Sequence, residues 1–150
     1  MIIPGHDNLL SSGDLLNLRN LLQERSNEFS GRNSAAAFLE KMIEEKGLKS
    51  AVISSRESFV RADREYYWSE EEFNILRQRL QGSGKMFAGL EVCKLAVDVF
   101  PNSALTYDNL GGAYIRNGEL KLAIESYERS LKLSPFNRNA EEILKILHQQ

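Results

Sequence analysis

A repeat of 34 residues is the feature of this sequence that most constrains its fold. Pro101 and Pro135 are separated by this interval, and most structural residues between Phe73 and Pro101 have a counterpart 34 positions later. The matching pairs are Phe73 and Tyr107, Leu76 and Leu110, Leu80 and Tyr114, Gly84 and Gly118, Gly89 and Ala123, and Cys93 and Tyr127. A fixed period of this length is typical of stacked helix pairs, because one such pair cannot bury its apolar face alone. The pattern therefore predicts an all-α stack.

The second copy of the repeat shows where its helices should lie. A first helix is expected from Ala104 to about Asn117, because its apolar and small residues recur at the spacing of one helix face. Gly111 costs a helix about 1 kcal/mol relative to alanine, so we expect the partner helix to cross there, with Ala123 at the crossing. Gly118 can take the left-handed conformation that ends a helix.

A second helix is expected from about Glu119 to Leu133, because Pro135 lacks a donor and clashes with the preceding turn. The residues expected on its buried face are Leu122, Ala123, Tyr127, Ser130 and Leu131. The first copy differs at three of these structural positions, with Arg77, Gly89 and Cys93 in place of Gly111, Ala123 and Tyr127. Residues 138–150 have helical spacing and are expected to form a helix that caps the stack.

Residues 34–65 predict a further, divergent helix pair ahead of the repeats. Ser34 can cap a helix over Ala35–Lys46, which Gly47 ends, and a second helix is expected over Leu48–Ala62. The residues expected to face inward from this second helix are Ala51, Val52, Ser55 and Phe59. Ser69 and Glu72 form a capping-box pattern, which predicts a helix start at Glu70. Runs that favour strands are limited to Met1–Ile3.

The motif of the second copy resembles the tetratricopeptide repeat. It reads Tyr107-x-x-Leu110-Gly111-x-x-Tyr114, then Ala123-x-x-x-Tyr127, then Pro135. The resemblance implies a right-handed stack of antiparallel helix pairs, with repeats at 70–103 and 104–137 and a capping helix at 138–150. It also implies a protein-interaction module that binds a protein or peptide in a groove formed by the first helix of each pair.

Within that family, the groove is lined by fixed positions of each first helix. The residues of this chain at those positions are Glu71, Asn74 and Gln78 in one copy, Leu105, Asp108, Gly112 and Arg116 in the other, and Asn139 and Glu142 in the last helix. One variant of the family grips the C-terminal carboxylate of a peptide with basic and amide side chains. Asp108 and Glu142 stand where such groups would be needed, so carboxylate gripping is not expected from these positions.

A longer stretch resembles a tail found on several bacterial hydrolases. The matching segments are Tyr66–Asn74, Phe100–Tyr114 and Ser130–Pro135. Residues 1–30 resemble the end of a metallo-β-lactamase-fold domain, where a short strand runs into Pro4-Gly5-His6 and a helix follows over Asp14–Phe29. The resemblance implies that the chain is the C-terminal part of a metal-dependent hydrolase and is not catalytic by itself. The alternative is a structural or dimerisation tail that docks on its own zinc hydrolase domain or on a second copy.

His6 would match the last zinc-ligating histidine of that family, but only if the upstream domain is present. A catalytic zinc needs about three protein ligands, and this chain offers only His6 and His148. We therefore expect no cofactor in this chain, although the resemblance implies zinc in the parent. The simpler interpretation of His6 is an exposed residue without a metal.

Composition excludes several other partners. The net charge of −2 and the pI near 5.8 do not favour nucleic acid or an anionic membrane surface. The sequence shows no signal peptide or transmembrane segment, and it leaves the compartment open. The aromatic run Tyr66-Tyr67-Trp68 is predicted to pack over a helix start in preference to stacking on a ligand. Cys93 is predicted to be buried and unreactive.

We expect the chain to retain no stoichiometric zinc after dialysis, because a single histidine lacks the partners that a site requires. Metal content per chain can be measured by mass spectrometry or atomic absorption. One zinc retained per chain would show instead that a metal site forms.

Overall fold

The computed structural model describes residues 32–61 and 65–149. Its contacts divide the chain into two units, Met1–Arg32 and Asn33–Gln150, and all described elements belong to the second unit. In chain order the elements are β1 (Asn33–Ser34), α2 (Ala35–Lys46), α3 (Leu48–Val60), β2 (Tyr66–Tyr67), α4 (Glu70–Gly82), α5 (Met86–Val99), α6 (Ala104–Arg116), α7 (Leu120–Leu133) and α8 (Arg138–Leu147). None of the helices in these ranges combines the length and hydropathy of a membrane span.

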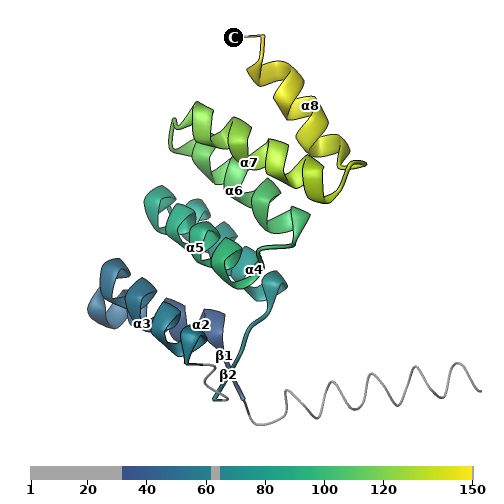
Figure 1. Cartoon of the computed structure of the whole chain (residues 1–150). Helices are drawn as coiled ribbons and strands as arrows, with labels where there is room; N and C mark the ends of the chain where they lie inside the picture. The colour runs from purple at the N-terminus through teal and green to yellow at the C-terminus, as the bar shows by residue number, and fades with distance from the viewer. Residues whose placement is uncertain (1–31, 62–64, 150) are drawn as a thin grey trace, which may run out of the picture. The chain divides into compact units, whose positions relative to one another are not determined.

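The helices form three consecutive pairs followed by a single helix. Each helix packs against its pair partner, so that α2 contacts α3, α4 contacts α5, and α6 contacts α7. The pairs then stack in chain order, with α5 against α6 and α7 against α8 (Figure 1). This arrangement confirms the predicted all-α stack with a helix at its C-terminal end.

The apolar core crosses from pair to pair. One cluster joins residues of α2 and α3 to residues of α4 and α5, with Leu39, Phe73, Leu76 and Leu95 fully buried. A second cluster lies between α5 and α6, and a third joins α7 to α8 through Tyr127, Ala140 and Leu144. Each pair therefore completes its burial with side chains from its neighbour.

Side-chain caps start three of the helices, two of them at the predicted positions Ser34 and Ser69. Ser34 Oγ accepts from the Ala37 amide, Ser69 Oγ accepts from the Glu72 amide, and Asn137 Oδ1 accepts from the Ala140 amide. The second half of the predicted capping box at Ser69 is wrong. The Glu72 carboxylate is directed to the preceding pair, where it accepts from Ser34 Oγ and from Tyr67 Oη, the latter at 2.7 Å.

Two short strands join the first pair to the repeats. β1 and β2 pair in parallel, with Asn33 opposite Tyr66 and Ser34 opposite Tyr67. Runs that favour strands are limited in the sequence to Met1–Ile3, which lies outside the described residues, so this pairing was not predicted. Two-residue strands show no alternation of apolar and polar residues, and the backbone contact that creates them is non-local.

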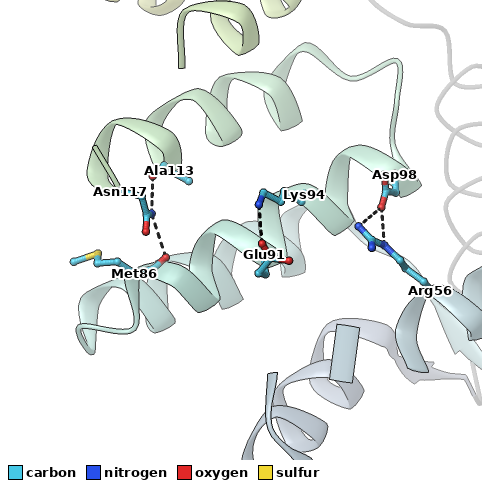
Figure 2. A network of polar contacts seen from close by, with 7 residues as sticks. All are labelled: Arg56, Met86, Glu91, Lys94, Asp98, Ala113 and Asn117. Carbon is cyan, nitrogen blue, oxygen red and sulfur yellow. Dashed lines mark hydrogen bonds and ion pairs between the residues drawn. The ribbon is translucent and has the colours of Figure 1, made fainter. Parts of the chain in front are cut away.

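Polar contacts also join consecutive helix pairs. Arg56 of α3 donates to Asp98 of α5 through Nε and Nη2, at 2.9 and 2.8 Å (Figure 2). At the end of α6, Asn117 Nδ2 donates to the Ala113 carbonyl at 2.9 Å and, more weakly, to the Met86 carbonyl of α5 at 3.5 Å. These contacts lie at the surface, where an ion pair contributes about 0–1 kcal/mol, so the apolar core supplies most of the stability.

The crossing within the second repeat differs from the expectation. The ring of Tyr127 lies over Gly111, and a Cβ at Gly111 would come within 2.7 Å of Tyr127 Cε2. Ala123 is fully buried, but it is not the residue that requires glycine at position 111. The aromatic ring needs the room because its bulk enters the space between the two helices.

Two other predictions of burial are wrong. Leu122 is 37% exposed, and Ser126 occupies the buried face in its place, where its hydroxyl donates to the Leu122 carbonyl. Phe59 is also 37% exposed. Its ring packs edge-on against Trp68, with the ring centroids 5.2 Å apart. Apolar spacing alone does not distinguish the centre of a helix face from its edge.

The contact between Gly111 and Tyr127 leads to a stability prediction with a matched control. Gly111→Ala should lower the free energy of unfolding by about 1–3 kcal/mol, because the buried Tyr127 ring has no room to move away. Gly112→Ala should be neutral or stabilising, because the nearest side-chain atom would lie 3.5 Å from its Cβ and alanine favours a helix by about 1 kcal/mol. Urea unfolding of both variants measures the difference. Equal stabilities would contradict the assigned contact.

Candidate functional site

The first helices α2, α4, α6 and α8 are linked along the stack by one polar contact at each step. Arg79 Nη2 of α4 lies 2.8 Å from Glu40 Oε2 of α2. Arg116 Nη1 of α6 donates to Gln81 Oε1 of α4 at 3.1 Å, and Asn139 Nδ2 of α8 donates to Asp108 Oδ2 of α6 at 2.8 Å. These contacts hold the first helices side by side.

We call the surface formed by their outward residues the first-helix face. All the residues predicted from the sequence to line a binding groove belong to α4, α6 and α8. They are Glu71, Asn74, Gln78, Leu105, Asp108, Gly112, Arg116, Asn139 and Glu142. Of these residues, Glu71, Gln78, Leu105, Arg116, Asn139 and Glu142 are exposed, whereas Asn74, Asp108 and Gly112 are partly buried.

Two of the predicted residues are held by neighbouring side chains. Asn74 Oδ1 accepts from Arg77 Nη2 at 2.7 Å and from Arg77 Nε at 3.1 Å. Asp108 accepts from Asn137 Nδ2 at 2.9 Å and from Asn139 Nδ2 at 2.8 Å. Asn74 and Asp108 therefore contribute to the rigidity of the first-helix face as well as to its surface.

Leu105 is the apolar member of this set, with 51% of its surface exposed. Gly112 lies seven residues further along α6, on the same side of the helix, and leaves that point of the face without a side chain. Such a combination of an exposed apolar side chain and a point without a side chain suits contact with an extended peptide.

Two residues of this region were not recognised as site residues from the sequence. Arg77 is only 9% exposed, and Gln81 is only 6% exposed. Arg77 Nη1 donates to Gln81 Oε1 at 2.8 Å, and Arg116 donates to the same oxygen. Burial lowers the pKa of Arg77, and the nearby charge of Arg116 acts in the same direction. The sequence did contain a sign of this site, because a charged residue, Arg77, occupies the position that Gly111 occupies in the second copy of the repeat.

Comparison with known proteins bears on this architecture. Residues 104–137 match the family model described as tetratricopeptide repeat.

The chain contains a tetratricopeptide repeat.

Two solved structures show the same fold at low sequence identity. The first tetratricopeptide domain of Spaghetti (RPAP3), bound to the HSP90 peptide SRMEEVD, is 22% identical, with a TM-score of 0.52 over 80% of this chain and 96% of that one. MamA is 19% identical, with a TM-score of 0.53 over 93% of this chain and 84% of that one. A search of curated proteins gives no match.

The aromatic run before α4 packs internally, as predicted. Trp68 stacks on Phe73 with ring centroids 5.7 Å apart, and Tyr66 lies 4.7 Å from the ring of Phe38. These contacts place both rings over the start of α4 and against the first pair.

The predicted metal-ligand segment lies outside the described residues. This applies to His6 and to the whole of 1–30, so the metallo-β-lactamase resemblance, the hydrolase parent and its zinc stay predictions. His148 is the residue that ends α8. Within residues 32–61 and 65–149, no group of three or more histidine, cysteine or acidic side chains is placed to hold a metal ion.

Cys93 of α5 lies 34 residues before Tyr127 of α7, so the two residues occupy equivalent positions in the two copies of the repeat. Cys93 is 3% exposed, and its Sγ lies 3.7 Å from the Asn109 carbonyl oxygen of α6. Burial raises the pKa of the thiol to about 12, although Arg77 and Arg116 act in the opposite direction. The thiolate, which is the reactive form, is therefore scarce at neutral pH.

We expect Cys93 of the folded chain to react with iodoacetamide at pH 8 far more slowly than the same cysteine after unfolding in urea. The pH lies well below the raised pKa, and the sulfur is also shielded from the reagent. Mass spectrometry of timed samples measures the two rates. Equal rates for folded and unfolded chain would contradict both the burial and the raised pKa.

Proposed function

We propose that this chain is a protein-interaction module that binds a peptide segment of a partner on the first-helix face. The observation that carries the proposal is the exposed Leu105 on α6, in a stack whose consecutive helix pairs are joined by a shared apolar core. A ligand would meet a preformed surface and would lose little free energy to reordering of that surface. The bound HSP90 peptide in the Spaghetti domain supports a ligand of this kind for the shared fold.

An alternative function is that of a structural tail, which docks on a hydrolase domain or on a second copy of the chain. A set of exposed apolar side chains on the opposite, second-helix side favours it. Ile53 is 48% exposed and Phe87 is 60% exposed, and both line one pocket with Leu48 and Val52 between α3 and α5. A docking tail would use this side and would leave the first-helix face free.

The proposed function can be tested by selecting peptides from a displayed random library against the purified chain. The affinity of a selected peptide is then measured by fluorescence anisotropy. Leu105→Arg should weaken binding about tenfold or more, because it removes the apolar contact and places a charge on the first-helix face. Ile53→Arg is the matched control, since it makes a similar change at a similarly exposed position on the other side, and it should change affinity less than about twofold.

Two results would contradict this proposal. One is a library that yields no binding peptide, and the other is a loss of affinity caused equally by Ile53→Arg. Light scattering of the same proteins addresses the alternative. A dimer that Ile53→Arg dissociates and Leu105→Arg preserves would favour the structural tail.

A further inference from the structure

Two guanidinium groups converge on one neutral oxygen between α4 and α6. Arg77 Nη1 and Arg116 Nη1 both donate to Gln81 Oε1, at 2.8 and 3.1 Å. The three side chains come from two consecutive first helices, and Arg116 is exposed on the first-helix face. The shared amide oxygen carries no negative charge to offset the two guanidinium groups, and it cannot form the paired, two-oxygen contact that a carboxylate forms with arginine.

Neither guanidinium has a carboxylate partner within residues 32–61 and 65–149. Other arginines in these ranges do have carboxylate partners. Arg56 forms an ion pair with Asp98, and Arg79 forms one with Glu40. Arg77 is more than nine-tenths buried, and a charge at that depth is costly unless it is paired. The arrangement therefore leaves positive charge without compensation.

Donors also outnumber acceptors at this point. Gln81 Nε2 is buried and has no hydrogen-bond partner among the described residues. The nearby acidic groups are engaged elsewhere, since Asp108 accepts from Asn137 and Asn139, and Glu70 accepts from Ser103 Oγ. A small cavity of about 10 Å³ lies beside Arg77 and Asn74 and extends to Thr106 and Asn109 of α6. The cavity borders Arg77 but neither Gln81 nor Arg116.

We propose that Arg77, Gln81 and Arg116 form the seat for a carboxylate of the peptide bound on the first-helix face. The inference rests on the proposed function and adds to it the chemistry of the ligand. A carboxylate can accept two parallel hydrogen bonds from the exposed Arg116 and replace the shared amide oxygen as its acceptor. Its negative charge also offsets that of Arg77, which lies directly behind.

The seat differs from the carboxylate-gripping positions considered from the sequence. Asp108, which disfavours a carboxylate there, shares α6 with Arg116 but lies eight residues before it, and Glu142 belongs to α8. Gln81 and Arg77 face α6 from α4. The sequence pattern of groove positions did not include either of them.

The test compares two synthetic versions of a library-selected peptide that contains glutamate. One version keeps the glutamate and the other has glutamine, and both have an amidated C-terminus. Replacing glutamate by glutamine should weaken binding to the native chain about tenfold, which is the effect of losing one charge-assisted contact. The same pair of peptides should bind equally to Arg116→Gln.

Arg79→Gln is the matched control. It removes the same charge from the exposed face of a first helix, but Arg79 is already paired with Glu40 at 2.8 Å. This variant should retain the full preference for glutamate. Circular dichroism of both variants checks that they are folded, and both positions are exposed enough for glutamine to be tolerated.

Two outcomes would overturn the proposed seat. The glutamate and glutamine peptides would bind the native chain equally, or the preference for glutamate would persist in Arg116→Gln. A third pair of peptides, with a free or an amidated C-terminus and no acidic side chain, identifies the source of the carboxylate. A preference for the free C-terminus that Arg116→Gln removes would support the seat and assign it to the chain end.

A measurement without any peptide separates failure of the seat from failure of the proposed function. The Nε–Hε NMR signals of Arg77 and Arg116 are followed during titration with N-acetylglutamate, with sodium chloride at equal ionic strength as reference. A saturable shift at these arginines, and none at Arg79, supports the seat even if no library peptide binds. Shifts no different from those in chloride would overturn it and leave peptide binding to be judged on its own result.

Discussion

The structure depends on one packing constraint, which is that no helix pair covers its own apolar face. Leu39 of α2, Phe73 and Leu76 of α4 and Leu95 of α5 share one cluster, although they come from two pairs. At the other end, Tyr127 of α7 is covered by Ala140 and Leu144 of α8. Because each pair is buried by its neighbour, the stability of the stack should be a sum of terms for the pairs and terms for the interfaces between them. The last helix covers the apolar face that the last pair would otherwise expose.

The same constraint explains how two copies of one repeat present different surfaces. In the second copy a small residue on the first helix, Gly111, meets the large Tyr127 on the second helix. In the first copy the sizes are reversed, with Arg77 on the first helix and Cys93 on the second. The close approach in the first copy is made instead by Gln81 against Gly89, and the buried Arg77 adds a charge that the second copy lacks at this position. The first copy therefore differs from the second in its chemistry as well as in its packing.

Sequence reasoning succeeded where the signal was local. The caps at Ser34 and Ser69, the helix end at Gly47 and the positive φ of 78° at Gly118 follow from residue type and position alone. It failed where a side chain selects between partners that are distant in sequence, as for Glu72, which binds Ser34 across 38 residues. For the site, the exposed positions of α4 and α6 could be named from the repeat. The bond from Arg116 to Gln81 could not, because it depends on the packing of one pair on the next.

The strand pairing between β1 and β2 has a consequence for how the molecule assembles. By joining Asn33 to Tyr66, it closes a loop that contains the whole of α2 and α3, whereas α6 and α7 are joined by the short turn at Gly118. Closing the longer loop costs more chain entropy than closing the short turns at Gly47 and Gly118, so the strand pairing is expected to form after the helix pairs. In hydrogen exchange, the amide of Asn33, which donates to the Glu65 carbonyl, would then lose protection before the amides of the helices.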